Sequence, residues 1–260
     1  MNRLRAIGML GLACLLQSLF AAAPPKPATI KNQQPHRVIE FSGMEWMVKS
    51  SAGKRVGPGP NYFGETNVWV DTQGRLHLKL THQDDRWIGA EIISRRSFGF
   101  GTYRFYLDTP LSQLDPNAVL GLFTYSDDPA FAHREIDVEC SRWSKAEDSN
   151  NAQFAVQPSE RRQHRVRFPV QPDLPATTYS FGWQSNSVAF TCLSGHARTP
   201  SATNAVIREW TFSGNGTPQP GDETVRLNLW LFRGRPPAEL KEVEVVISKF
   251  EFEPLTRAGR

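Results

Sequence analysis

The sequence predicts an all-β fold, a large sandwich of two antiparallel sheets with one concave face. Short stretches of alternating apolar and polar residues recur along the chain, which is typical of half-buried strands. Turn-forming stretches separate them, such as Gly-Pro-Gly-Pro at 57–60 and Ser-Asp-Asp-Pro at 126–129. No long segment has the 3.6-residue apolar period of a helix, and no internal repeat is evident. So many short strands indicate two packed sheets, or a barrel as the less favoured alternative.

The clearest strands alternate regularly for six or more residues. In the strand expected at 243–252, the apolar residues change from one parity to the other between Ile247 and Phe250, which predicts a bulge or bend near Ser248. Large aromatic residues of a sandwich usually belong to its core, and we expect this of Trp46, Trp69 and Trp183. The clearest strands are expected at 76–81, 103–108, 225–232 and 243–252.

The N-terminus differs from the rest of the chain. Arg3 and Arg5 precede an apolar run over 6–20 and three alanines, which is the order of a secretory signal peptide over residues 1–23. The run is too short to span a membrane comfortably. Cys14 gives only a weak lipoprotein signal, because the apolar run continues past it. We expect a Pro/Ala-rich linker at 24–38, a single domain at 39–256, and a secreted or periplasmic protein.

Composition limits the classes of partner. The 260 residues carry a formal net charge of +4 with no block of five or six basic residues, so a nucleic-acid partner is not indicated. A hydrophobic content of 39% suits a globular domain, which we expect to be a monomer. Cys140 and Cys192 could pair in an exported protein, but both fall on apolar positions, and we expect them to be free and buried.

The most informative stretch is 135–139, Glu-Ile-Asp-Val-Glu. As a strand it places Glu135, Asp137 and Glu139 on one face and the aliphatic residues on the other. Three like charges in a row repel one another, so the arrangement is costly unless it serves a function. Paired carboxylates are what hydrolysis of a glycosidic bond requires.

A solvated acidic edge strand or a divalent-cation site could also contain such a row of carboxylates. The edge strand is disfavoured because Ile136 and Val138 need a buried face. The cation site is disfavoured because calcium prefers carboxylates and carbonyls from a flexible loop, and no stretch resembles one. No His/Cys spacing indicates zinc. We therefore expect no cofactor and no catalytic metal, while a structural calcium ion stays open.

The stretch 135–139 resembles the active-site signature of glycoside hydrolase family 16, in the regular-strand form of lichenases and xyloglucan-active members. The resemblance extends over about 40–255 and implies a concanavalin-A-like β-jelly-roll with a substrate cleft. It implies that Glu135 is the nucleophile, Glu139 the acid/base and Asp137 an assisting carboxylate. Other segments fit in order, and they are 60–63, 90–101, 123–125, 153–154 and 228–230.

Candidate substrate-binding residues follow from this resemblance and from aromatic stacking on sugars. Trp143, four residues past Glu139, is expected on the carboxylate face if its strand stays regular, and His133 shares the parity of Glu135. For His133 an ordinary hydrogen-bonding role is the favoured alternative. The full set of candidates is Asn61, Phe123, Tyr125, His133, Trp143, Gln153, Asn228 and Trp230.

Several positions depart from the lichenase pattern. His133 stands where lichenases typically have tryptophan, Ile93 stands at an arginine position, and Ala155 and Gln157 replace Asn and Tyr. The stretch 233–237 lacks the tryptophan that usually follows the Asn-Leu-Trp strand. The resemblance thus implies the chemistry but not the sugar specificity.

The arginines of that stretch, Arg233 and Arg235, could meet acidic groups on a sugar polymer, although a solvated loop is favoured. The expected function is a secreted, retaining endo-glycosidase acting on a polysaccharide, with β-glucan favoured. A transglycosylase would use the same covalent intermediate. A non-catalytic lectin on the same sandwich is the alternative from another class. The linkage, and the choice between glucans and an algal galactan, stay open.

Overall fold

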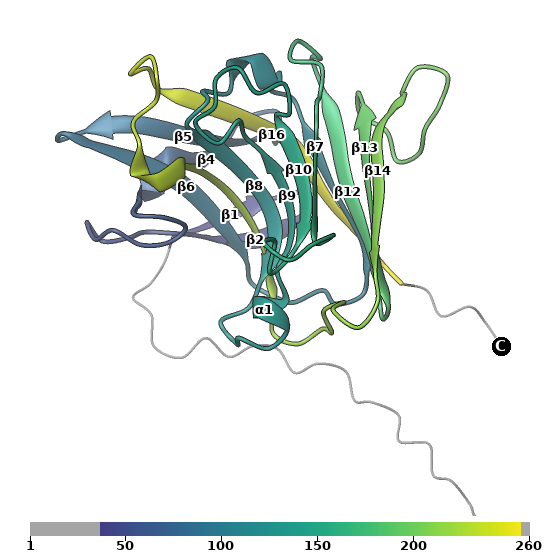
Figure 1. The fold of residues 1–260 in the computed structure, drawn as a ribbon. Helices are drawn as coiled ribbons and strands as arrows, with labels where there is room; N and C mark the ends of the chain where they lie inside the picture. Colours follow the sequence, from purple (N-terminus) through teal and green to yellow (C-terminus); the bar gives the residue numbers. More distant parts are fainter. Residues whose placement is uncertain (1–36, 256–260) are drawn as a thin grey trace, which may run out of the picture.

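The computed structural model describes residues 37–255, which form two packed layers of β-strands (Figure 1). The expected signal peptide and most of the expected linker lie outside the described residues. The first strand begins at Val38, so the domain starts one residue before the expected boundary at 39. Within 37–255, no helix is long and apolar enough to cross a membrane.

The first layer is a curved sheet with the hydrogen-bonded order β11-β10-β9-β8-β15-β6, antiparallel throughout. β2 pairs with β6 and β1 with β2, which widens the sheet. The short β3 pairs parallel to β6, an exception to the expected antiparallel pattern. The bounds are β1 Val38–Phe41, β2 Met44–Val48, β3 Tyr62–Phe63, β6 Arg86–Ser94, β8 Ala118–Tyr125, β9 Ile136–Cys140, β10 Ala152–Val156, β11 Arg165–Phe168 and β15 Thr224–Leu231.

The second layer has the order β5-β16-β7-β12-β13-β14, with β4 paired to β5. The β16 register shifts between Ile247 and Lys249, which confirms the bulge expected near Ser248. The two layers are joined where Thr81–Gln83 of β5 pairs with β6 in a hairpin. The bounds are β4 Val68–Val70, β5 Leu76–Gln83, β7 Gly101–Leu107, β12 Thr177–Gln184, β13 Ser187–Ser194, β14 Val206–Ser213 and β16 Val243–Pro254.

Four short helical segments lie in the connections between the described strands. The one that matters for the site is α1, a four-residue turn that ends directly before β9. The other three are 3-10 turns. The bounds are α1 Phe131–Arg134, η1 Glu65–Asn67, η2 Leu111–Gln113 and η3 Phe232–Gly234.

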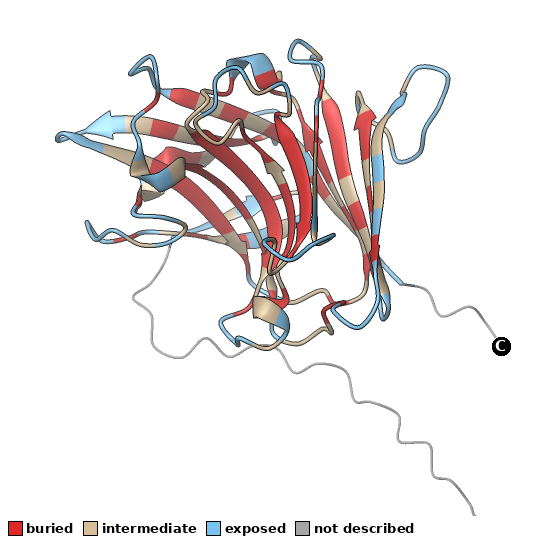
Figure 2. Ribbon diagram, viewed as in Figure 1, coloured by how far each residue is buried: buried red, intermediate tan, exposed pale blue. Residues whose placement is uncertain are grey.

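The apolar core lies between the two layers, where the strands are buried (Figure 2). Trp46 of the curved layer meets Phe250 of the other layer edge to face, with ring centroids 5.4 Å apart. Trp46 and Trp183 are fully buried, as expected. The expectation for Trp69 is wrong: it is only partly buried, because Val68 takes the inward parity of the three-residue strand β4.

Both cysteines of the described chain are free and buried, as expected. Cys140 is on β9 and Cys192 on β13, so they come from opposite layers. Burial raises the pKa of the Cys140 thiol to about 12, with the Tyr179 hydroxyl as its neighbour. Both thiols therefore act as small apolar core groups.

Candidate active site

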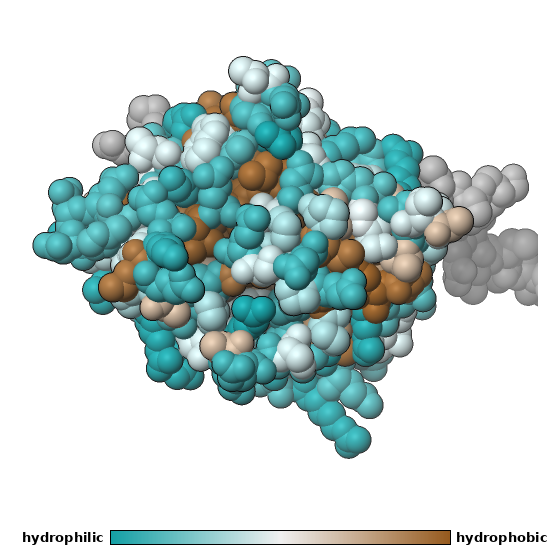
Figure 3. Space-filling model, turned by 90° about the horizontal axis from the view of Figure 1, so that it is seen from above, coloured by the Kyte–Doolittle hydropathy of each residue, from teal (hydrophilic) through white to brown (hydrophobic). Residues whose placement is uncertain are grey.

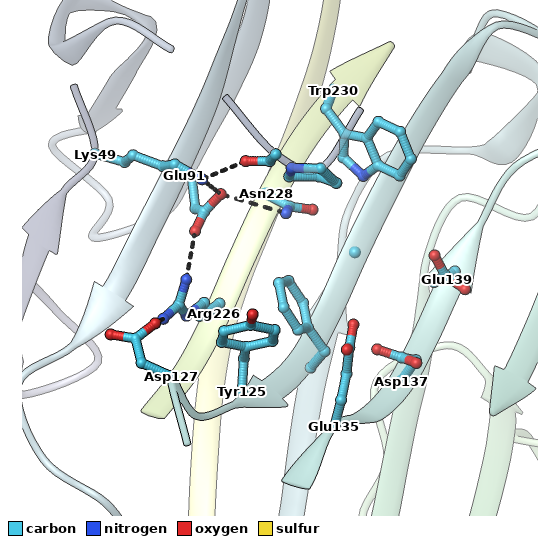
Figure 4. A pocket seen from close by; sticks show the side chains of 14 residues that line it. Lys49, Glu91, Tyr125, Asp127, Glu135, Asp137, Glu139, Arg226, Asn228 and Trp230 are labelled. Carbon is cyan, nitrogen blue, oxygen red and sulfur yellow. Dashed lines mark hydrogen bonds and ion pairs between the residues drawn. The ribbon is translucent and has the colours of Figure 1, made fainter. Parts of the chain in front are cut away.

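Asp137 and Glu139 lie on one face of β9, and Glu135, directly before the strand, lies on the same side, as the alternation predicts. Ile136, Val138 and Cys140 are fully buried in the core, so the other parity faces the opposite side of the curved sheet. Glu135, Asp137 and Glu139 line a cavity of about 350 Å³ on that side (Figure 4). One five-residue strand thus supplies both a core face and the acidic face of a cleft.

A left-handed turn sets the position of Glu135. All four residues of α1, Phe131–Arg134, have φ between +51° and +67°, a region that residues with a side chain rarely adopt. The buried Arg134 holds the turn by donating to the Gln219 carbonyl and to Asp128, at 3.0 and 2.8 Å. Thr124 donates to the Arg134 carbonyl at 2.8 Å and accepts from the backbone of Ile136. The chain therefore enters β9 in a fixed orientation.

Two glutamines of the neighbouring strand region orient the carboxylates. The Gln153 amide donates to Glu139 at 2.5 Å, and the Gln157 amide donates to Asp137 at 2.9 Å. Gln153 was expected near the substrate, and the structure places it beside the acid/base candidate. The sequence indicated Gln157 only as a departure from the lichenase pattern. The alternation of β10 continued by one step beyond its end would have indicated it.

Burial raises all three carboxyl pKa values, and repulsion between carboxylates adds to this for Glu135 and Asp137. Burial raises the pKa of Glu139 to about 7, against the hydrogen bond from Gln153 and the charges of Arg165 and Arg167, which lower it. Burial and the charge of Glu139 raise the pKa of Glu135 to about 7. Burial raises the pKa of Asp137 furthest, because both glutamates flank it. A proton on Asp137 is shared by hydrogen bond with Glu135, which favours the ionised form of Glu135.

The next two strands after β9 in the sheet, β8 and β15, supply the adjoining part of this cavity. Phe123 and Tyr125 of β8 and Asn228 and Trp230 of β15 all line it, which brings four of the candidate binding residues to the carboxylates (Figure 4). Phe123 and Trp230 are each 9% exposed, so one edge of each ring is open to the cavity. The Asn228 side-chain oxygen is buried and has no hydrogen-bond partner among the described residues.

A buried ion cluster lies beside β15, around Glu91 of the next strand β6, and the sequence did not indicate it. Glu91 is 1% exposed and pairs with Lys49 at 2.7 Å and with Arg226 at 3.6 Å. The Arg226 guanidinium also lies 4.5 Å from the centre of the Tyr125 ring, and its charge favours ionised Glu135. Arg226 shares the parity of Asn228, so the strand pattern contained that signal. Lys49 directly follows β2, and no sequence pattern indicated that it belongs to the site.

Trp143 reaches the cleft by another route than expected. β9 ends at Cys140, and Trp143 lies in a turn with φ of +54°, so the regular strand on which the parity prediction depended does not extend to it. Its ring still packs edge to face on Trp230 and Phe232, with centroids 6.3 and 5.2 Å apart. It lines a second cavity of about 620 Å³ that shares Glu135 and Glu139 with the first. Viewed from above, hydrophilic side chains cover most of the surface and apolar ones show between them (Figure 3).

Two expected binding residues have other positions. Asn61 is 3% exposed, and its amide donates to the carbonyls of Pro58 and Leu231, both at 2.9 Å, so it fastens the rim loop and is not open to sugar. His133 lies in the left-handed turn and not on β9, so its parity with Glu135 does not apply. Its ring stacks on Tyr125 at 5.0 Å and bonds the Ser126 carbonyl, and it lines neither cavity.

The side chains that line the cleft carry carboxyl groups, amides, aromatic rings and basic groups. Among residues 37–255, no group of three or more His, Cys, Asp or Glu side chains is arranged to hold a metal ion. The three carboxyl groups are coupled to one another through hydrogen bonds and mutual repulsion.

Comparison with known proteins supports the fold. No protein-family model matches this chain, and no curated protein matches its sequence. Solved structures do match. A β-glucanase of Bacillus licheniformis superposes with a TM-score of 0.59 at 20% identity, covering 80% of this chain and 91% of the other. A glycoside hydrolase family 16 endo-glucanase from Bacteroides ovatus gives 0.59 at 14% identity, covering 80% and 94%.

A third match has a different description. A pseudo β-1,3-glucanase of Mycobacterium tuberculosis superposes with a TM-score of 0.57 at 18% identity, covering 81% of this chain and 91% of the other. The resemblance to glycoside hydrolase family 16 is thus confirmed at the level of the fold, the jelly-roll sandwich. At these identities the fold is what is shared.

Proposed function

We propose that this protein is a retaining endo-glycosidase that cleaves β-linked sugars within a polysaccharide. Glu135 is the nucleophile, Glu139 the acid/base and Asp137 the carboxyl group that modulates Glu135. The observation that supports this most is the common cleft face of these three groups, two of them with a pKa of about 7. A glycosidase needs one carboxylate ionised and a second protonated at the same pH.

Parts of the surroundings support these two roles. Arg226 and the hydrogen bond from Asp137 favour the ionised form of Glu135, as a nucleophile requires. Burial favours the protonated form of Glu139, against the charges of Arg165 and Arg167, and the protonated group can give its proton to the leaving oxygen. Glu139, once ionised, then takes a proton from the water that hydrolyses the glycosyl-enzyme bond. Gln153 holds its carboxyl group in place through both steps.

Reducing-end release from a panel of β-glucans and β-galactans tests this proposal. The wild type should cleave one polymer, and Glu135→Gln and Glu139→Gln should each lower the rate by at least about 10³-fold. Glu147→Gln, an exposed glutamate outside both cavities, is the matched control and should keep full activity. Proton NMR of the first product should show the β-anomer, as retention requires. Inversion, or activity retained by both variants, would contradict the proposal.

The same experiment separates the two alternatives. A transglycosylase would give products longer than the substrate, because a second sugar intercepts the covalent intermediate. A lectin would bind a polymer without cleaving it, and Glu135→Gln would leave that binding intact. Export to the periplasm or outside the cell, with cleavage after about residue 23, belongs to the same proposal and is tested by N-terminal sequencing of the exported protein. A monomer is proposed as well, and light scattering tests it.

A further inference from the structure

The second cavity of the cleft is bordered by positive charge. It extends from Glu135 and Glu139 past Trp143, between β11 on one side and the end of β15 with η3 on the other. Among the described residues, the only carboxylates that line it are those two glutamates. Five basic side chains line it, namely Lys145, Arg165, Arg167, Arg233 and Arg235.

Four of these cations form no ion pair within 37–255, although the charge of Arg165 lowers the pKa of the Glu139 carboxyl group. Arg167 is engaged, because it pairs with Asp148 at 2.5 Å and donates to the Asn150 carbonyl. The other four are exposed, and none forms an ion pair or a side-chain hydrogen bond with any residue of that range. Unpaired exposed arginines also occur elsewhere, for example Arg96, Arg161 and Arg162, but these line neither cavity of the cleft. We call the four unpaired residues the basic arm, and they are Lys145, Arg165, Arg233 and Arg235.

Residues from separate parts of the chain form the basic arm. Arg165 begins β11, Lys145 follows Trp143 in its turn, and Arg233 and Arg235 lie in and directly after η3. The fold thus gathers like charges around one cavity, where they repel one another unless an anion occupies it. No described carboxylate outside the catalytic pair is available there to balance them.

The same cavity also offers a surface for sugar. Trp143, Trp230 and Phe232 pack edge to face and line it together. Aromatic rings of this kind bind the C–H faces of pyranose rings, while guanidinium groups bind carboxylates and sulfates in bidentate geometry. The Arg233 guanidinium lies 5.0 Å from the Phe232 ring, so the two kinds of contact adjoin.

The first cavity contrasts with this arrangement. Its two cations, Lys49 and Arg226, are both paired with the buried Glu91. Within the cleft of the described chain, free positive charge is therefore confined to one side of the catalytic pair. A polymer with negative charges would be repelled by the carboxylates of β9, and the basic arm offsets that repulsion on its own side.

We propose that the polysaccharide in this cleft is anionic, and that its carboxylate or sulfate groups bind the basic arm while its sugar rings stack on Trp143. The proposal rests on the proposed function, because it names the substrate class of the same site. It deepens the assignment from a β-linked polymer to a β-linked polymer with acidic substituents.

Binding to matched polymers tests this without requiring turnover. Glu135→Gln protein is titrated with hydroxyethyl, carboxymethyl and sulfate derivatives of a β-1,4-glucan, and with neutral, carboxymethylated and sulfated β-1,3-glucan. At least one acidic derivative should bind about tenfold more tightly than its neutral counterpart, and less tightly as salt rises. Which derivative binds distinguishes carboxylate from sulfate. Equal affinity for neutral and acidic forms, or no binding of any acidic polymer, would overturn the proposal.

A pair of charge variants locates the binding. Arg233→Gln/Arg235→Gln in the same protein should weaken acidic-polymer binding by about tenfold and leave binding of the neutral polymers unchanged. Arg161→Gln/Arg162→Gln removes the same charge from exposed residues that line neither cavity, and should change affinity less than about twofold. Equal losses in the two variants would mean a general charge effect and would overturn the proposal.

These experiments test the anionic substrate and the glycosidase reaction separately, so one proposal can fail while the other holds. Acidic polymers that bind through Arg233 and Arg235 but are never cleaved by the wild type would refute the glycosidase and keep the anionic ligand. Cleavage of a neutral glucan that depends on Glu135 and Glu139, with no effect of the arginine variant, would keep the glycosidase and refute the anionic substrate.

Discussion

Neutralising Glu139 should make the protein more stable as well as inactive. The pKa of this buried carboxyl group is raised from 4.5 to about 7, so the native state binds its proton more tightly than the unfolded chain does. The protonated Glu139 carboxyl group therefore contributes fully to the free energy of unfolding below about pH 4.5, and this contribution is lost as pH rises through about 7. A shift of this size corresponds to about 3 kcal/mol in the free energy of unfolding. The amide introduced by Glu139→Gln cannot ionise, so the variant keeps its stability as pH rises.

Thermal melts of the wild type and Glu139→Gln across this pH range measure the effect. For a domain of this size, about 3 kcal/mol is worth about 6–12 °C in Tm. The variant should melt with the wild type near pH 4.5 and above it by this amount at about pH 8. Glu147→Gln, on the exposed surface, should show no pH-dependent difference from the wild type. A Tm difference that is flat with pH, or a wild type that is more stable at about pH 8, would refute the reasoning.

Three further predictions concern the site and the core. Gly121→Ala would place a Cβ 2.5 Å from the side-chain oxygen of Asn228, so thermal melts should show a free energy of unfolding lower by about 1–3 kcal/mol. Gly182→Ala is the control, because its added Cβ would have its nearest neighbour at 3.8 Å. It should change the free energy of unfolding by less than about 0.5 kcal/mol. The rate of polymer cleavage should fall as pH rises past about 7, because Glu139 loses the proton it donates; a rate that keeps rising there would contradict its role. In the native chain Cys140 and Cys192 should not react with Ellman's reagent, and should react after unfolding; fast native labelling of either would show that the core opens.

Local patterns predicted the features that depend on strand periodicity. The alternation over 135–139 placed the carboxylates on one face, and the parity change in β16 placed the bulge, because the side-chain period of a strand is two. Asn228 and Trp230 were placed opposite the apolar face of β15 in the same way, and both line the cleft.

Features that depend on unusual backbone or on distant pairing were not predictable in this way. Alternation presumes an extended chain, so it failed for His133 in the left-handed turn and for Trp143 past the end of β9. The ion cluster of Glu91 required knowledge that β6 and β15 are neighbours, although they lie far apart in the sequence. The basic arm likewise combines segments that only the fold brings together.

The place of β15 has a consequence for the order in which the chain folds. Of the described strands only β16 follows it along the chain, yet β15 lies between β8 and β6 in the middle of the curved sheet. Asn61 is hydrogen-bonded to Leu231, 170 residues away. Such long-range pairings close slowly, and until β15 arrives the edges of β8 and β6 are unpaired. A nascent chain that ends before residue 224 would therefore have no cleft, and two open strand edges that other chains could join.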